Sequence, residues 1–208
     1  MKLSRVKKLT WKLLLVYAGC IALVCLADPD PRKYLRGWFW AGFGVVLVGQ
    51  FVRFWAAGHL VKNKVLTVTG PYAYVKNPLY IGTFLALVGF SIMAKGDPRS
   101  PYWFLRYANW IVLALAVLVF VAYYVPYKKK READRLRDIF GESWDHYDRS
   151  VPDYLPRWTR YERAERRPWS WPATCENSEQ WTPLSIAVGT FALLFSGTIL
   201  DLASRLWK

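Results

Sequence analysis

The sequence predicts an all-α, multi-span helical membrane protein with about five transmembrane helices, a cytoplasmic helical segment towards its C-terminus and no Rossmann domain. Three observations lead to this prediction. Of the 208 residues, 54% are hydrophobic, and they gather in long runs with few charges. The formal net charge of +14 comes from basic residues that lie between these runs. No stretch shows the alternating strand and helix pattern of a βαβ unit. Apolar runs flanked by basic loops are typical of membrane proteins.

The same charge pattern argues against other classes of protein. A soluble domain this basic would suggest a nucleic-acid partner, but here the apolar runs explain the composition better, so we expect a lipid bilayer as the partner and no nucleic acid. The three cysteines and two histidines have no metal-ligand spacing, and Cys20 and Cys25 lie within an apolar run. We therefore expect neither a disulfide framework nor a metal site.

The first apolar run, residues 13–27, follows a basic N-terminus without acidic residues. A secretory signal peptide with Ala27 at the cleavage point has the same pattern. At about 15 residues, however, the run is at the upper limit for the apolar region of a signal peptide. We favour a retained transmembrane helix, which together with the following loop forms an N-terminal unit, residues 1–37.

Three further spans form the predicted core, residues 38–158. The first, residues 38–58, is rich in glycine, which suits close helix packing in lipid. The next two, residues 78–94 and 107–125, are joined by a short turn and therefore run antiparallel. Arg53 lies deep in the first of these spans. It either faces a cavity or partner, as intramembrane charges usually do, or extends to the cytoplasmic interface.

Two polar stretches border these spans. Asn77 and Pro78 predict the start of a helix, because asparagine is a favoured N-cap and proline suits the first helical position. Residues 132–141 predict a short amphipathic helix that ends at Gly141. A basic and aromatic tail with a final apolar run at 184–200 makes up residues 159–208, and this run is at the short limit for a span.

The distribution of Lys and Arg sets the predicted orientation. Most of them fall in residues 1–12, 59–77 and 128–183. The positive-inside rule therefore places the N-terminus and both polar stretches on the cytoplasmic side. We expect a multi-pass integral membrane protein whose residues 59–77 and 128–183 lie next to each other.

The two polar stretches resemble a known family. Residues 70–72 (Gly-Pro-Tyr) and 75–82 (Val-Lys-Asn-Pro-Leu-Tyr-Ile-Gly) are similar to the Gly-Pro-Tyr…Arg-His-Pro-x-Tyr-x-Gly block of isoprenylcysteine carboxyl methyltransferases. Residues 132–152 resemble the second block of that family, which runs from a Glu-Glu pair through Phe-Gly to Val-Pro. Together the blocks cover about residues 50 to 156.

The sequence departs from the family pattern at three places. The Arg-His pair is Lys76-Asn77 here, and an Asn-Pro form is familiar from phosphatidylethanolamine N-methyltransferases. Ala133 replaces the second glutamate, and Trp144 replaces the first tyrosine after Phe-Gly. The first difference bears on the substrate, and the second removes one carboxylate from the acidic site.

The resemblance implies an S-adenosylmethionine-dependent methyltransferase that releases S-adenosylhomocysteine and acts on a lipidic substrate. The substrate would be a prenylated cysteine carboxylate, a phospholipid amine or another amphiphile. The cofactor would lie on the cytoplasmic side, between the start of the 78–94 span and the Glu132 segment. The implied catalytic residues are Arg53 and Glu132. The implied cofactor-binding residues are Tyr74, Lys76, Asn77, Pro78, Tyr80, Gly82, Arg131, Glu132 and Tyr147.

Two other functions remain open. Sterol-reductase-like membrane enzymes share this shape and bind NADPH, although the sequence shows no dedicated signal for the nicotinamide phosphate. A helical membrane protein without enzymatic activity would tolerate changes at Asn77, Tyr80 and Glu132. Binding of S-adenosylhomocysteine or NADPH distinguishes these possibilities.

Overall fold

The computed structural model describes residues 27, 30, 32–61, 65–119, 121–122 and 125–206. Over these residues the chain is helical and contains no strand, which confirms the predicted all-α class for the part described. The predicted segment 13–27, apart from its last residue, lies outside the described residues. So does the choice between a retained span and a signal peptide.

Helices α2 (Gly37–His59) and α3 (Pro78–Met93) form the central hairpin of the fold. Both match the predicted spans closely. Four glycines, spaced seven residues apart in each helix, line the contact between them. A Cβ atom on Gly42 would lie 2.6 Å from the carbonyl oxygen of Gly89, and one on Gly49 equally close to that of Gly82. The two backbones are therefore packed too closely for any side chain at these positions.

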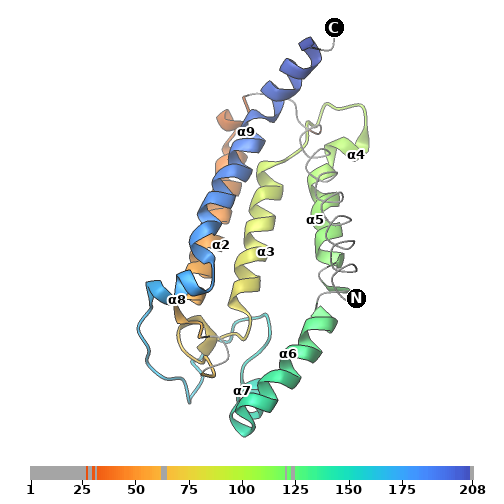
Figure 1. Ribbon diagram of the computed structural model, residues 1–208. Coiled ribbons are helices and arrows are strands. Elements are labelled where there is room, and N and C mark those ends of the chain that lie inside the picture. Colours follow the sequence, from red (N-terminus) through yellow and green to blue (C-terminus); the bar gives the residue numbers. More distant parts are fainter. Residues whose placement is uncertain are drawn as a thin grey trace, which may run out of the picture.

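Two further helices lie on the side of α3 that faces away from α2 (Figure 1). After α4 (Trp103–Arg106), α5 (Ala108–Val119) runs beside α3 (Figure 1). The buried Asn109 amide donates a hydrogen bond of 2.7 Å to the carbonyl oxygen of Ser91. The final helix, α9 (Thr182–Leu206), packs against the α2–α3 hairpin. Phe39, Val46, Met93, Ala94 and Leu193 form the buried core between these three helices.

Two described segments are long and apolar enough to cross a membrane. They are α2 and residues 179–198, which include most of α9. Helix α3 and residues 108–118 of α5 are also apolar, but they are shorter than a typical span. A protein of about five spans is therefore not confirmed by the helices described.

The polar segments gather at one end of the bundle. Helix α6 (Val125–Phe140) turns into α7 (Glu142–Ser150) at Gly141, whose φ of +53° favours glycine. Helix α6 begins earlier than the predicted residue 132, because Pro126 is tolerated in a first helical turn. Figure 1 shows α6, α7 and α8 (Trp171–Glu176) at the same end as the loop between α2 and α3. The predicted proximity of residues 59–77 and 128–183 is thus observed.

A second hydrophobic cluster joins these segments. Trp144, Tyr147 and Val151 from α7 and its end pack against Val68 and Ala73 of the loop and against Tyr161 of the tail. Leu136 and Phe140 of α6 cover this cluster. The apolar stripe predicted for residues 132–141 therefore packs against protein, at least through these two side chains.

Candidate functional site

The two sequence blocks that resemble the methyltransferase family are held together by hydrogen bonds. The Tyr147 hydroxyl donates to the carbonyl oxygen of Tyr72 at 2.8 Å. The backbone N–H of Lys76 donates to the carbonyl oxygen of Pro152 at 2.9 Å. The short 3-10 helix η2 (Gly70–Ala73) thus lies against α7 and the residues that follow it. Segments more than seventy residues apart in sequence meet here.

Lys76 lies between two carboxylates. Its Nζ is 2.6 Å from Oδ1 of Asp148 and 2.8 Å from Oδ1 of Asp153, and its side chain is only 9% exposed. Such a pair of carboxylates neutralises the buried ammonium group and fixes the position of the loop. The predicted contact of Lys76 with a cofactor carboxylate stays a prediction, and the structure assigns its charge to these two aspartates.

Asn77 occupies the N-cap position of α3, but its side chain does not cap the helix. The amide instead donates to the carbonyl oxygen of Asp153 at 3.1 Å. Pro78, buried, is the first residue of the helix. The predicted helix start is therefore correct, whereas the predicted capping bond is wrong, because the amide is used to hold the segment after α7.

Arg53 is held by an acidic residue of the tail. Its Nε and Nη2 donate to the two carboxylate oxygens of Glu179 at 3.0 and 2.6 Å, a bidentate arrangement. Its Nη1 donates to the Thr83 hydroxyl. Glu179 belongs to η4 (Glu179–Trp181) and is 6% exposed. The sequence left open whether Arg53 faces a cavity or partner or extends to the cytoplasmic interface. The structure shows that its guanidinium binds a partner, Glu179.

Gly82 makes room for this arginine. A Cβ atom there would lie 2.5 Å from Cγ of Arg53 and 2.6 Å from the carbonyl oxygen of Gly49. The predicted cofactor-binding role of Gly82 is untested, and its evident function is to let α2, α3 and the arginine side chain pack together.

Tyr72 places a buried hydroxyl at this junction. Its side chain is 6% exposed, and its hydroxyl has no hydrogen-bond partner among the described residues. Burial raises the pKa of the phenol, and the negative charges of Glu179 and Glu132 raise it further. A buried polar atom without a partner costs free energy in the isolated protein, so it marks a place where a ligand would be favourable.

The remaining predicted residues are spread around the junction. Glu132 is exposed on α6. Tyr80 is half-buried in the first turn of α3. Tyr147 is buried, with its ring 5.4 Å from that of Tyr161. Tyr74 packs against the cluster that contains Trp144 and Tyr147, and it also lines a cavity. The side chain of Arg131 lies outside the described part of the chain.

Sequence reasoning missed Tyr72 and Glu179 as site residues. Glu179 could have been found as the partner of Arg53. Glu179 lies shortly before the last apolar run, and Arg53 lies towards the end of the run at 38–58. A charged residue within a membrane usually needs a partner of opposite charge. Tyr72 belongs to the Gly-Pro-Tyr motif, but its burial follows from the tertiary packing of η2 against α7.

The burial of Tyr147 predicts a loss of stability at alkaline pH. Burial raises the pKa of its phenol above the ordinary value of 10.0, with smaller effects from Tyr72, Tyr161 and Asp148. The unfolded protein therefore releases this proton first, and stability falls as the pH rises above about 10. We expect Tyr147→Phe to lose about 1 kcal/mol at neutral pH, with its hydrogen bond, and to show a shallower alkaline decline. Thermal unfolding followed from about pH 8 to about pH 11 measures both effects.

The exposed Tyr102 serves as the control for this measurement. Tyr102→Phe should reproduce the stability of the parent protein at every pH. An alkaline decline that is equally steep with and without the Tyr147 hydroxyl would contradict the assignment.

Comparison with models of protein families, with curated proteins and with solved structures gives no match to this chain. The resemblance of the two motifs to membrane methyltransferases therefore stays a prediction from the sequence.

Proposed function

We propose that the protein is an integral membrane methyltransferase that uses S-adenosylmethionine and acts on a lipidic substrate. The observation that carries the proposal is the buried Tyr72 hydroxyl. It is buried and lacks a hydrogen-bond partner among the described residues. It also lies where the two motif blocks pack together.

The surface of the helices supports the membrane part of the proposal. Large apolar side chains point outward on every long helix of the bundle: Leu47, Val48 and Phe51 on α2, Phe84 and Leu87 on α3, Leu115 and Leu118 on α5, and Val188 and Phe191 on α9. In water such a surface would associate or aggregate. In lipid it is the expected contact surface, so α3 and α5 belong to the bilayer region together with the two longer candidates. The proposed protein is multi-pass, and the positive-inside rule predicts that its residues 59–77 and 128–183 lie on the cytoplasmic side.

The residues at the junction fit the proposed cofactor in chemical type. S-adenosylmethionine carries a sulfonium, an ammonium and a carboxylate, so its site needs charges of both signs and aromatic rings. The Glu132 carboxylate would accept a hydrogen bond from the ammonium or the ribose hydroxyls. The Tyr72 hydroxyl would donate to the cofactor carboxylate. Tyr80, at the start of α3, and Tyr147 would supply aromatic surface.

The chemistry of such a site is mainly positioning. S-adenosylmethionine supplies an electrophilic methyl group for an in-line displacement, and orientation of the nucleophile accounts for much of the rate. A carboxylate acceptor needs no base. An amine acceptor must lose a proton, and Glu132 is the carboxylate placed to accept it. Arg53, paired with Glu179, holds α2, α3 and the tail in register, which makes it a positioning residue.

Calorimetry tests the proposal directly. Protein purified in detergent is titrated with S-adenosylhomocysteine and, separately, with NADPH. We expect saturable heat with the first ligand only. Glu132→Gln and Tyr72→Phe should each weaken the binding of S-adenosylhomocysteine about tenfold, because each removes one polar contact with a charged ligand. The thermal midpoint should change little for Glu132→Gln, since Glu132 is exposed. It should rise for Tyr72→Phe, since the buried hydroxyl has no partner among the described residues.

Asp134→Asn is the matched control, because it removes one negative charge from an exposed position of the same helix. It should leave the affinity unchanged. Equal weakening by Asp134→Asn and Glu132→Gln would reduce the effect to general electrostatics. Absence of heat with S-adenosylhomocysteine would refute the proposal, and heat with NADPH instead would favour the reductase alternative.

A further inference from the structure

An open cavity of about 480 Å³ lies between the end of α2, the loop that carries η2, and the tail. Trp55 and His59 from the end of α2, Gly70 and Tyr74 from the loop, and residues 160 and 165–168 of the tail line it. Its volume falls in the range of small-molecule sites. The residues of the candidate cofactor site, apart from Tyr74, do not line it, so it requires a separate explanation.

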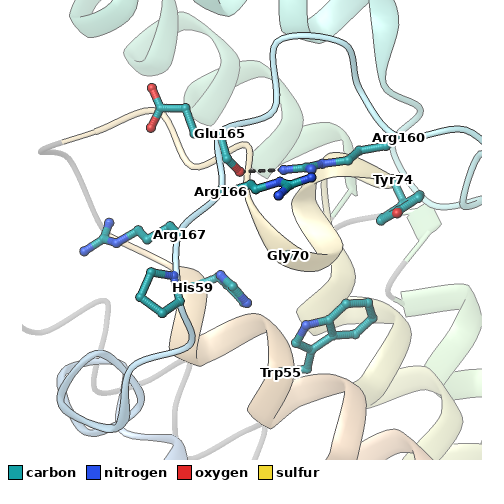
Figure 2. A pocket seen from close by; sticks show the side chains of 9 residues that line it. Trp55, His59, Gly70, Tyr74, Arg160, Glu165, Arg166 and Arg167 are labelled. Carbon is teal, nitrogen blue, oxygen red and sulfur yellow. Dashed lines mark hydrogen bonds between the residues drawn. The ribbon is translucent and has the colours of Figure 1, made fainter.

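The tail brings a concentration of positive charge to this cavity. Arg160, Arg166 and Arg167 all line it, with Glu165 as the single acidic lining residue. Figure 2 shows the side chains of Arg160 and Arg166 directed toward each other above Gly70, while Glu165 extends away from them. Guanidinium groups that converge without an acid between them repel each other. An anion placed between them would remove this repulsion.

The position of Arg160 is fixed by the backbone. Its Nη2 donates to the carbonyl oxygens of Ala164 at 3.1 Å and Glu165 at 2.7 Å. These bonds fold residues 160–165 into a compact loop and hold one guanidinium at the cavity. A preformed donor loses less conformational entropy when it binds a ligand.

The wall of the cavity opposite the arginines is aromatic. Trp55 lies below Gly70 in Figure 2, and the buried His59 ring packs against this glycine. The Thr69 hydroxyl and Nδ1 of His59 are 3.2 Å apart and form a hydrogen bond that orients the ring. Gly70 has a φ of +55°, and a Cβ atom there would collide with the imidazole. The loop is therefore shaped around an amphipathic cavity with a basic rim and an aromatic wall.

The tryptophans around α2 place this cavity at the level of lipid headgroups. Trp169 donates through Nε1 to the carbonyl oxygen of Phe54 at 2.9 Å, and the ring of Trp171 lies 6.4 Å from that of Phe54. The side chains of Trp169 and Trp171 are about half exposed, and that of Trp55 is somewhat less exposed. Tryptophan concentrates at the boundary between hydrocarbon and headgroups. A basic cavity at this boundary is in reach of lipid phosphates.

We propose that this cavity binds the phosphate group of an anionic amphiphile, with Arg160 and Arg166 on the phosphate and Trp55 beside the apolar part. The ligand class is a phosphate monoester or diester, and the position of the cavity favours an anionic phospholipid over free phosphate. Its role is to hold the loop and tail at the membrane surface. The proposal does not depend on methyl transfer, because neither its residues nor its test involve turnover.

Binding to short-chain lipids in detergent provides the test. Full-length protein in dodecyl maltoside is titrated with dioctanoyl phosphatidic acid, dioctanoyl phosphatidylglycerol, dioctanoyl phosphatidylcholine and inorganic phosphate, and binding is followed by thermophoresis. We expect saturable binding of the two anionic lipids and clearly weaker binding of phosphatidylcholine and phosphate. Arg166→Gln should weaken the binding of phosphatidic acid by about fivefold or more, because it removes one charge-assisted contact.

Arg163→Gln is the matched control. Arg163 belongs to the same segment and is exposed, but it does not line the cavity. It should leave the affinity unchanged. Arg160→Gln, which also removes the bonds that fold the loop, should weaken binding at least as much as Arg166→Gln. Thermal unfolding of each variant shows whether the fold is retained.

Each result decides the proposal. Equal weakening by Arg163→Gln and Arg166→Gln would mean that the lipids bind only through general charge, and the cavity would lose its assignment. Absence of saturable binding for every phosphate compound would have the same meaning. Inorganic phosphate that binds as tightly as phosphatidic acid would retain the phosphate site but overturn the lipid source.

Discussion

Replacing Glu179 by alanine is expected to lower the free energy of unfolding by about 3 kcal/mol, since a charge left without its partner in a buried pair is strongly destabilising. Arg53 would keep only Thr83 and the carbonyl oxygen of Leu79 as neutral partners. The side chain of Arg53 is 22% exposed and that of Glu179 only 8%, so solvent cannot replace the lost carboxylate fully. Unfolding by sodium dodecyl sulfate in mixed micelles, followed by circular dichroism, measures the change.

A double variant separates the cost of the unpaired charge from the loss of side-chain volume. In Arg53→Met with Glu179→Met both charges are gone, and removing a whole buried pair is often close to neutral. We expect this variant to recover most of the stability lost in Glu179→Ala. A double variant as unstable as the single one would show that the ion pair itself is not what holds the tail against α2.

Gly49→Ala is expected to disrupt the contact between α2 and α3. The added Cβ would lie 2.6 Å from the carbonyl oxygen of Gly82 and 2.8 Å from the backbone N of Ala86. Both are main-chain atoms, which cannot move aside as a flexible side chain does, so the helices must separate. We expect a loss of about 3 kcal/mol, at the upper end of the usual cost of overpacking. The same detergent unfolding assay applies.

Gly44 provides a control within the same helix. A Cβ atom there would meet nothing within 4 Å. Gly44→Ala should therefore raise stability by up to about 1 kcal/mol, through the better helix propensity of alanine. The two substitutions are chemically identical and are expected to act in opposite directions. If Gly44→Ala and Gly49→Ala changed the stability equally, the close backbone contact at Gly49 would not be the reason why a larger side chain is excluded there.

The helices of the core were the most predictable part of the structure. Uninterrupted apolar residues and the Asn77-Pro78 junction predicted α2 and α3 to within about two residues, since these signals are local. The start of α6 was less predictable. The sequence predicts that the preceding span ends at residue 125 and that the amphipathic helix begins at 132. Lysine and arginine are good helix formers, however, and α6 continues through the residues between them.

The partners of the charged residues were not predictable from local patterns. Lys76 meets Asp148 and Asp153 because the loop after η2 packs against α7 and the residues that follow it. Arg53 meets Glu179 because η4 packs against α2. No periodicity in the sequence encodes which carboxylate reaches which cation. The sequence does not predict that the Tyr72 hydroxyl is buried without a partner among the described residues, because this also depends on tertiary packing.

The distance along the chain between Arg53 and Glu179 affects how the protein is made. The two residues are 126 positions apart, so at a synthesis rate of about 5–20 residues per second roughly 6–25 s pass between their emergence from the ribosome. During this interval the guanidinium has no acidic partner from the tail. The ion pair that ties the tail to α2 therefore forms late, after Glu179 has emerged.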